Sequence, residues 1–387
     1  MDSRSSTPED TEYSVALDRV SGLGPKKFDA LERAFPTMEQ AWSASPAELT
    51  EAGLDQTSTQ KVIERRDSIN PDNELSRPHD SGVRAITRQS SLYPTRLAQI
   101  YDPPAVIYVR GALTEADGRS VAVIGTRKAS AHGREACKVL TGELARNGIT
   151  VISGLARGID GIAHAAALDA GGRTIAVLGS GLDRIYPSEH LNLARRISES
   201  GTLISEFPLD ARPDAHNFPR RNRILSALSL GTLVIEASFK SGAMLTVEHA
   251  VQQNKEVFAV PGSILSESNK GTNWLIQQGA KLVTGVDDVL DELNIVVKGG
   301  QLPMPMQTKE IVLENDLEVT VLGIIDAEPR HIDDVTRTTG FESSTVASTL
   351  SMLEIKGLVR QAGPMQYARV REVQAVYEPS ITGSQEK

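Results

Sequence analysis

The chain has 387 residues, 40% of them hydrophobic and 24% charged, which is typical of a soluble globular protein with two or three domains. Its longest apolar runs are only as long as a β-strand, so we expect no membrane span, and its one cysteine, Cys137, excludes an internal disulfide bond and is expected to be a buried thiol. The polar, acidic first residues argue against a secretory signal. We therefore expect a cytoplasmic protein that begins with a disordered tail over residues 1–12.

The net charge of −9 is unevenly distributed along the chain. Residues 1–80 hold 9 Lys and Arg against 16 Asp and Glu, and residues 305–374 hold 7 against 11, whereas residues 121–288 hold 18 against 16. A polyanion is attracted to the part of a protein that lacks an acidic excess. Any nucleic-acid site is therefore expected in the middle of the chain.

Residues 13–70 show short helical patterns and are predicted to form a small helical domain. The stretch VSGLGPKKFDALERAF contains a glycine turn, Gly22 and Gly24, between apolar residues. It resembles a helix-hairpin-helix or SAM-like module, in which turn amides can bind a DNA phosphate. The acidic excess of this region favours a protein-docking domain instead, and both interpretations stay open. The polar residues 71–82 are predicted to form a linker.

Short apolar segments then alternate with helical patterns between residues 83 and 295. The segments AVIYV, VAVIG, ITVIS, TIAVL, TLIS, TLVIE and EVFAV are rich in β-branched residues and apolar along nearly their whole length. Strands of this kind are typical of a parallel sheet with helices on both faces, so the pattern predicts a doubly wound α/β domain. The intervening helices are predicted at residues 131–147, 160–171, 190–200, 219–230 and 243–253.

The last part of the chain is predicted to hold a second folded domain. Residues 296–308 are expected to be a linker, and residues 375–387 a tail. Residues 309–374 show three helical patterns followed by a hairpin about a Gly-Pro turn, which indicates a winged-helix-like domain. The helices that would face DNA carry acids such as Asp333 and Asp334, so this domain is expected to contact a protein rather than DNA.

Glycines and arginines follow the predicted strands. Thr126 and Arg127 come after VAVIG, and the turn SGLARGID follows ITVI. In a doubly wound sheet ligands bind beyond the carboxyl ends of the strands, where glycines permit close approach and helices begin. These strand ends therefore predict an anion site. Within the turn we expect Asp160 to cap its helix and His164 to be a packed helix residue.

The stretch HNFPRRNRIL places three arginines in the first turn of a predicted helix. The helix dipole disfavours cations there, which suggests that an external partner supplies negative charge. Arg220 and Arg223 share one helix face, whereas Arg221 points elsewhere and is expected to be structural. Arginine binds phosphate through its planar fork. With few aromatic residues beside Phe218, a single-stranded nucleic acid would be held mainly by phosphate contacts.

The sequence lacks the signatures of several catalytic and cofactor sites. It has no G-x-x-x-x-G-K-[ST] loop, and Gly125-Thr126-Arg127 stands where a dinucleotide site would have G-x-G-x-x-G. Its seven histidines and one cysteine show no metal-ligand spacing. We therefore expect no cofactor and no metal, and we expect a protein that is not an enzyme.

Seven ordered blocks between residues 91 and 285 closely resemble the DNA processing protein A (DprA) family: SLYPTRLAQIYDPPAVIYVRG, VAVIGTRKASAHG, ISGLARGIDGIAHAAALDAGGRTIAVLGSGLDRIYP, LISEFPL, FPRRNRI, IEASFKSGAMLTVEHA and VFAVPG. The resemblance implies an extended Rossmann-like fold over residues 83–295 and a homodimer. It also implies a sequence-independent single-stranded DNA-binding protein, which loads RecA recombinase and relieves competition from single-strand-binding protein in natural transformation and homologous recombination.

The same resemblance implies which residues form the DNA pocket. They belong to the GTR motif, the SGLARGID turn, the FPRRNR stretch and the start of SGAMLTVE: Gly125, Thr126, Arg127, Ser153, Gly154, Arg157, Gly158, Phe218, Arg220, Asn222, Arg223 and Ser241. Relatives often carry a lysine where Ser188 stands, and Arg184 or Arg212 is the expected replacement.

Two other functions stay open. SGAMLTVE resembles the loop of a related Rossmann-like group that hydrolyses nucleoside monophosphates, in which Glu248 would act beside Arg127. Alternatively, the chain is mainly an assembly scaffold whose two acidic end domains dock partners.

Overall fold

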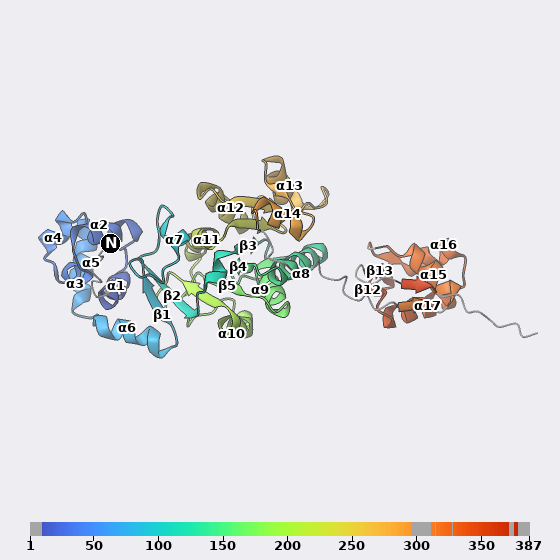
Figure 1. Ribbon diagram of the computed structural model, residues 1–387, viewed down its shortest axis with the longest axis horizontal. Coiled ribbons are helices and arrows are strands. Elements are labelled where there is room, and N and C mark those ends of the chain that lie inside the picture. Colours follow the sequence, from blue (N-terminus) through green and yellow to red (C-terminus); the bar gives the residue numbers. More distant parts are fainter. Residues whose placement is uncertain (1–9, 296–310, 314, 327, 371–374, 378–387) are drawn as a thin grey trace, which may run out of the picture. The chain divides into compact units, whose positions relative to one another are not determined.

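The computed structural model describes residues 10–295, 311–313, 315–326, 328–370 and 375–377. By its internal contacts the chain divides into one unit that ends at residue 296 and a second that begins at residue 297 (Figure 1). The predicted linker over residues 296–308 lies outside the described residues, as do most of the two predicted tails.

The first unit begins with helices that start at well-capped positions. The side-chain oxygens of Thr37, Ser45, Asp55 and Asn70 accept hydrogen bonds from first-turn amides of four of them. The last helix occupies most of the stretch that was predicted to be a linker, so that prediction is wrong. The helices are α1 (Thr11–Asp18), α2 (Pro25–Ala34), α3 (Met38–Ser43), α4 (Pro46–Glu51), α5 (Gln56–Arg66) and α6 (Pro71–Asp80).

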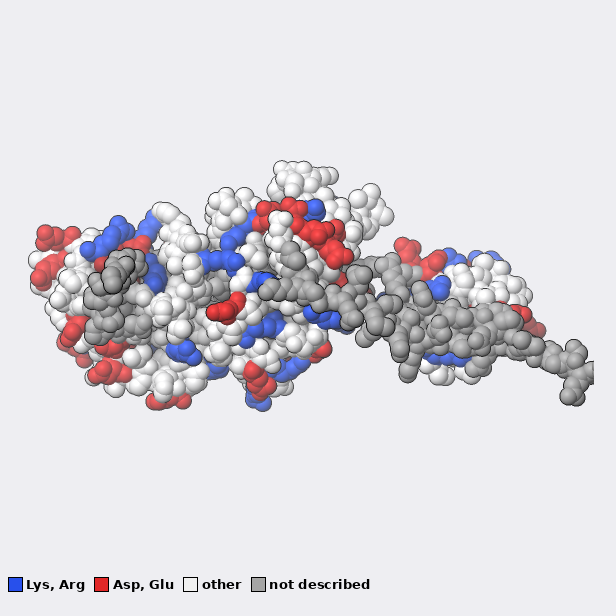
Figure 2. All heavy atoms as spheres, in the orientation of Figure 1, with Lys and Arg blue, Asp and Glu red and all other residues white. Residues whose placement is uncertain are grey.

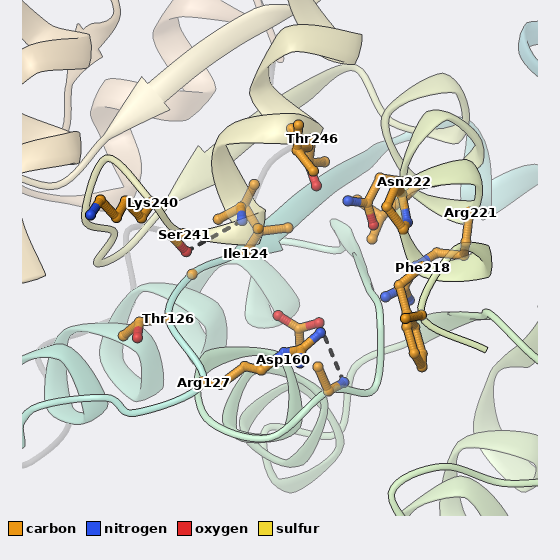
Figure 3. A pocket seen from close by; sticks show the side chains of 18 of the residues that line it. Ile124, Thr126, Arg127, Asp160, Phe218, Arg221, Asn222, Lys240, Ser241 and Thr246 are labelled. Atoms are coloured by element: carbon orange, nitrogen blue, oxygen red, sulfur yellow. Dashed lines mark hydrogen bonds between the residues drawn. The ribbon is translucent and has the colours of Figure 1, made fainter. Parts of the chain in front are cut away.

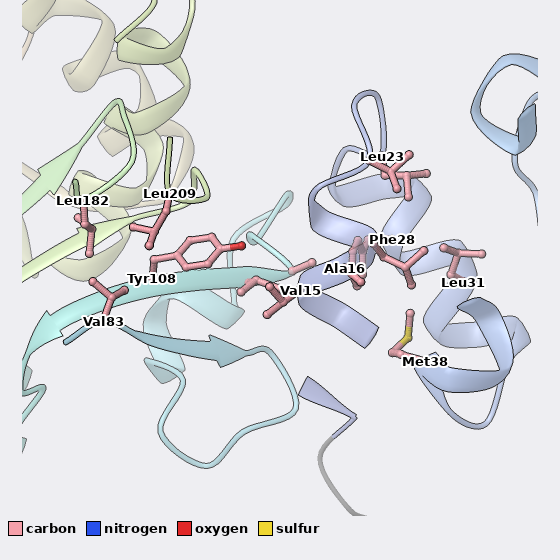
Figure 4. Packing of buried hydrophobic residues seen from close by; sticks show 14 of the residues in the cluster. Val15, Ala16, Leu23, Phe28, Leu31, Met38, Val83, Tyr108, Leu182 and Leu209 are labelled. Atoms are coloured by element: carbon pink, nitrogen blue, oxygen red, sulfur yellow. The ribbon is translucent and has the colours of Figure 1, made fainter. Parts of the chain in front are cut away.

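These helices share a hydrophobic core with the sheet that follows. Val15 and Phe28 of the helices belong to the same buried cluster as Leu209 of a later loop and Tyr108 of strand β2 (Val106–Gly111) (Figure 4). Tyr108 is fully buried, and its hydroxyl donates a 2.9 Å hydrogen bond to the Asp18 carboxylate. The helical region is therefore packed onto the sheet as part of one unit.

In the described residues the strands form a nine-stranded sheet in the order β1-β2-β6-β5-β4-β3-β7-β8-β9. The run from β6 to β9 is parallel throughout, as the sequence pattern predicts. The strands are β1 (Arg84–Thr87), β2 (Val106–Gly111), β3 (Ser120–Ile124), β4 (Thr150–Ser153), β5 (Thr174–Leu178), β6 (Thr202–Ser205), β7 (Gly231–Val234), β8 (Glu256–Ala259) and β9 (Lys281–Leu282).

The segment AVIYV departs from that prediction. It forms β2, which pairs antiparallel with both β1 and β6. A parallel partner requires a long crossover, usually a helix of some length, whereas β1 and β2 are joined by a loop that contains only the four-residue helix α7 (Thr95–Ala98). The predicted parallel sheet therefore carries an antiparallel edge at β1 and β2.

Helices cover both faces of the sheet because successive strand residues point to opposite sides. Val121 and Val123 pack with α8, α9 and α14, whereas Ala122 and Ile124 pack on the side of α7, α11, α12 and α13. The remaining elements of this unit are η1 (Glu115–Gly118), α8 (Ala131–Arg146), α9 (Ile159–Asp169), η2 (Ser188–His190), α10 (Leu191–Ser200), α11 (Asn217–Leu228), α12 (Gly242–Gln252), η3 (Glu267–Asn269), α13 (Lys270–Gln277) and α14 (Val286–Glu292).

The second unit is a winged helix. Its helices enclose a core that includes Val335, Val346, Leu350 and Leu353. The wing is a hairpin about the predicted Gly-Pro turn, with Gly363 at the end of one strand and Pro364 and Met365 in the turn. A strand at residues 375–377 was not foreseen, because these residues were assigned to a tail. The elements are β10 (Ile311–Leu313), α15 (Asp316–Ile324), β11 (Arg330–His331), α16 (Ile332–Thr339), α17 (Ser343–Ile355), β12 (Val359–Gly363), β13 (Gln366–Arg369) and β14 (Ala375–Tyr377).

Across the described residues of both units, no helix has the length and apolar character needed to cross a membrane.

Candidate nucleic-acid interface

A cavity of about 770 Å³ lies at the carboxyl ends of β3 and β7. From β3 the chain continues to β4 on one side, and it later returns to β7 on the other side of β3. Ligands of doubly wound sheets bind at such a switch point, because the loops that leave the two strands diverge there. The position of this cavity therefore follows from the strand order.

The cavity brings together six of the twelve residues that the sequence assigned to a pocket. They come from the loops after β3 and β7 and from one face of α11 (Figure 3). These six residues are Gly125, Thr126, Arg127, Phe218, Asn222 and Ser241.

Arg127 occupies the exposed rim of this cavity beside two aromatic rings. Its guanidinium carbon lies 5.8 Å from the centre of the Phe218 ring, and the rings of Phe218 and Tyr186 are also 5.8 Å apart. Tyr186 is 45% exposed and follows β5. A cation next to partly exposed aromatic rings offers a phosphate contact and a stacking surface side by side.

Lys128 and Lys240 line the same cavity and were missed by the sequence analysis. Both are exposed, and in the part of the chain that the structure describes neither they nor Arg127 forms an ion pair with a carboxylate. Their charges are therefore available to a ligand. A signal for them was present in the sequence, because Lys128 follows β3 and Lys240 follows β7, the two strands at the switch point.

The interior of the cavity holds one buried acidic residue and one buried basic residue. Asp160 and Arg221 are 8% and 4% exposed, and both line the cavity (Figure 3). Burial raises the pKa of the Asp160 carboxyl, an effect that the charge of Arg221 opposes. Burial lowers the pKa of Arg221 to about 10, so its guanidinium stays protonated at neutral pH. As expected, Arg221 points away from the face that Arg220 and Arg223 share: its guanidinium donates a hydrogen bond to the Val177 carbonyl, and it faces the cavity.

Backbone amides of the turn SGLARGID bind a carboxylate of the protein itself, that of Asp160. Gly158, with φ of +76°, is the N-cap of α9, so the expectation that Asp160 caps this helix is wrong. Asp160 instead accepts hydrogen bonds from the amides of Gly154 at 3.2 Å and Ala156 at 3.4 Å. The buried Ser153 hydroxyl donates to the Val123 carbonyl. None of the three predicted residues of this turn, Ser153, Gly154 and Gly158, lines the cavity.

Three arginines assigned to the pocket are paired with carboxylates instead. Arg157 forms two hydrogen bonds of 2.8 and 2.9 Å with Glu189, outside the cavity. Arg220 donates to Glu206 at 3.1 Å. Arg223 is 4% exposed, is bound by Glu206 and by Asp102, and does not line the cavity. Arg220 and Arg223 share a helix face, as expected, but that face meets Glu206.

The replacements suggested for a lysine at Ser188 do not line the cavity either. Arg184 lies 3.5 Å from Asp183 and 3.7 Å from Asp210, and Arg212 is exposed on the loop before α11. The cations of the cavity are therefore Arg127, Lys128, Arg221 and Lys240.

The remaining candidate residues have structural roles or lie elsewhere. His164 is fully buried, with Nδ1 2.7 Å from the Thr174 hydroxyl, and burial lowers its pKa to about 3, so it is a packed residue as expected. Cys137 is buried as predicted, and burial raises the pKa of its thiol to about 12. Glu248 is exposed and does not line the cavity. No cluster of metal-ligating side chains occurs in the residues that the structure describes.

The charged side chains on the visible surface are distributed unevenly, as they are along the sequence. Figure 2 shows Asp and Glu atoms over α14 and over the outer N-terminal helices, and Lys and Arg atoms both over the N-terminal helices and between these two regions.

The family profile described as DNA recombination-mediator protein A matches residues 84–294, and the profile described as DprA winged helix domain matches residues 307–363. The chain belongs to the DNA recombination-mediator protein A family. Protein Smf of Synechocystis sp. is 34% identical in an alignment of 390 positions that covers 92% of this chain and 98% of that protein. DNA processing protein DprA of Bacillus subtilis is 43% identical over 220 residues, which cover 57% of this chain and 74% of that protein.

The family also accounts for the architecture. The crystal structure of DNA processing protein A from Streptococcus pneumoniae superposes with a TM-score of 0.64 at 34% identity, covering 73% of this chain and 97% of that one. The matched family region, residues 84–294, contains all nine strands of the sheet described above and every residue that lines the cavity.

Proposed function

We propose that this protein binds single-stranded DNA without regard to sequence, and that the cavity at the switch point holds the strand. The observation that carries the proposal is the set of three exposed cations on the rim: Arg127, Lys128 and Lys240 have no carboxylate partner among the described residues. They come from the loops after two neighbouring parallel strands. Phosphates are the ligand that unpaired, exposed cations beside glycine-containing loops are best suited to bind.

We assign different parts of a nucleotide to different parts of the cavity. Arg127 and the two lysines contact phosphate oxygens at the rim. Phe218 and Tyr186 offer a stacking surface to a base, which works for any base because every base has a π-face. Arg221 contributes positive charge from below, and its Nε atom has no hydrogen-bond partner among the described residues. None of these contacts reads a base edge, so the proposed binding is independent of sequence.

The strand is held and not cleaved in this proposal. Hydrolysis of a nucleotide would require an acid or base beside the bound substrate. Glu248, the candidate for that role, lies outside the cavity. The carboxylate that does line the cavity, Asp160, is engaged by two backbone amides and lies near Arg221. The observations therefore favour binding over the nucleoside-monophosphate hydrolase.

The biological role that we propose rests on membership of the family. A recombination mediator holds single-stranded DNA so that RecA recombinase can be loaded in place of single-strand-binding protein, acting as a homodimer in the cytoplasm during natural transformation and homologous recombination. We assign partner contacts to the acidic end regions. Helix α17, which would enter a DNA groove, contains one glutamate and no lysine or arginine in SSTVASTLSMLEI. That composition supports protein docking by the winged helix.

The test is the salt dependence of DNA binding in charge-reversal variants. Arg127→Glu and Lys240→Glu are expected to weaken binding to oligothymidine and to mixed sequences equally. Each lost phosphate contact makes the plot of log affinity against log salt shallower by roughly 0.7. Arg195→Glu, the same charge change at an exposed residue of α10, is the matched control. Fluorescence anisotropy across a salt series measures the slopes.

Two outcomes would contradict the proposal. If Arg127→Glu and Lys240→Glu kept the wild-type slope, the cavity would not be the DNA site. If they weakened binding to some sequences only, the cavity would read bases, and sequence-independent binding would be wrong.

A further inference from the structure

A second hollow adjoins the cavity on the side of α8 and α9. It measures about 460 Å³ and is lined by nine residues, two of which, Arg127 and Lys128, also line the first cavity. The two hollows therefore meet at these side chains. The other lining residues are Ala129, Arg134, Gly158, Gly161, Ile162, Ala165 and His190.

The lining of this second hollow is basic and contains no carboxylate. Arg134 is exposed on α8, and one of its guanidinium nitrogens donates a 2.7 Å hydrogen bond to the carbonyl of Ala129. Within the described residues its charge has no acidic partner. A side chain that is anchored to the backbone but electrically unpaired is placed to contact a phosphate, because part of the entropy of ordering it is already lost in the free protein.

His190, which also lines this hollow, is oriented by a backbone carbonyl. Its Nδ1 lies 2.9 Å from the Leu155 carbonyl, which can only accept, so Nδ1 carries the proton in that bond. The other ring nitrogen lies beside Gly161, where a side chain would overlap the ring. Gly161 therefore makes room for the His190 ring at the edge of the hollow.

Other directions away from the first cavity are less favourable for a polyanion. On the side of α11, Arg220 and Arg223 are neutralised by Glu206. Arg184, at the loop after β5, lies close to Asp183 and Asp210. Toward α8 and α9, the side chains that line the second hollow continue from Arg127 and Lys128 to Arg134, which forms no ion pair within the described residues.

We propose that the second hollow is an extension of the DNA site: the strand leaves the cavity across Arg127 and Lys128, and a following phosphate binds Arg134. This inference rests on the proposed function. It assigns to Arg134 a contact made only by oligonucleotides long enough to fill the cavity and continue beyond it. Residues of the cavity itself contact short and long oligonucleotides alike.

The test compares oligothymidines of increasing length, from about four to about twenty nucleotides, a range that spans typical sites for single strands. For the wild type, affinity is expected to rise with length beyond the point at which the cavity is filled. Arg134→Glu is expected to match the wild type on the shortest oligonucleotides and to bind the long ones roughly tenfold less tightly. Arg134→Ala should show a smaller loss at the same lengths, because it removes the contact without adding repulsion.

Two controls separate this inference from the proposed function. Arg127→Glu should weaken binding at every length, and Arg195→Glu at none. If Arg127→Glu weakens binding and the length profile of Arg134→Glu superimposes on that of the wild type, the extension is overturned and the cavity stands. The extension is also overturned if Arg134→Glu weakens binding equally at all lengths. If Arg127→Glu changes nothing, the proposed function fails, and this inference fails with it.

Discussion

Glu206 accepts a hydrogen bond from Arg223 in the protein interior, where the two side chains are 3% and 5% exposed. The same carboxylate accepts from Arg220, which is 53% exposed. One acid at the end of β6 thus neutralises two arginines of α11. Part of the positive charge of the FPRRNR stretch is therefore neutralised by a carboxylate of the protein itself.

The first prediction concerns the stability that this acid provides. Glu206→Gln leaves the buried Arg223 guanidinium with Asp102 as its remaining acidic partner, and removal of one member of a buried pair typically costs about 3–5 kcal/mol. We expect a loss of about 3 kcal/mol in the free energy of unfolding, measured by urea denaturation. Asp102→Asn is the control. Its side chain is 40% exposed, so a loss below about 1 kcal/mol is expected. Equal losses in the two variants would refute the central role of Glu206.

The second prediction concerns the backbone behind the cavity. Gly158 has φ of +76°, and a Cβ there would overlap the carbonyl of Thr126 and the backbone of Arg127. Gly171 has a similar φ of +73°, but a Cβ there meets open space. Gly171→Ala should therefore cost about 1 kcal/mol of stability from the left-handed conformation alone. Gly158→Ala should cost distinctly more and should weaken DNA binding, because Arg127 must move.

Thermal unfolding and DNA anisotropy of the two alanine variants provide the measurement. A Gly158→Ala protein that matched Gly171→Ala in both would show that the overlap is relieved without disturbing the cavity.

The third prediction is a pH dependence at the junction of the N-terminal helices and the sheet. Burial raises the pKa of Asp18 from 3.8 to about 7, against the hydrogen bond from Tyr108, which lowers it. The folded state then binds more protons than the unfolded state between these pH values, so Asp18 lowers stability progressively as pH rises from about 4 to about 7. Asp18→Asn does not titrate and keeps an acceptor for Tyr108.

We therefore expect the stability of Asp18→Asn relative to the wild type to increase between pH 4 and pH 7 and to level off above. Urea unfolding at several pH values measures it, with Asp72→Asn, at an exposed acid of α6, as the control. A constant difference across this range would mean that Asp18 is not protonated in the folded protein.

Much of the secondary structure is present in local patterns. The seven apolar segments predicted as strands all form strands of the sheet, because residues buried on both faces must be apolar at every position. The helix starts at Ser130 and Ser241 are likewise local, since each hydroxyl accepts from an amide a few residues on. The prediction of a linker over residues 71–82 failed because it was based on their polar composition, whereas most of these residues form a helix packed on its neighbours.

The antiparallel direction of the edge strand β2 could not be predicted from the local sequence. The apolar segment that forms β2 looks like its parallel neighbours, but its partner β6 lies almost a hundred residues later. The pairing depends on which edge of the sheet remained open, and no local pattern encodes that.

By itself, the sequence determined that glycines and arginines follow the strands of a doubly wound sheet, and hence that an anion site lies at the strand ends. Only the tertiary structure decided which cations are available. Helical spacing puts Arg220 and Arg223 on one face, but Glu206 and Asp102 reach that face from distant segments and neutralise it. Arg127 and Lys240 form no ion pair, because within the described residues no carboxylate from a distant segment lies within ion-pair distance of them. Charge availability depends on three-dimensional neighbours, which spacing along one helix does not specify.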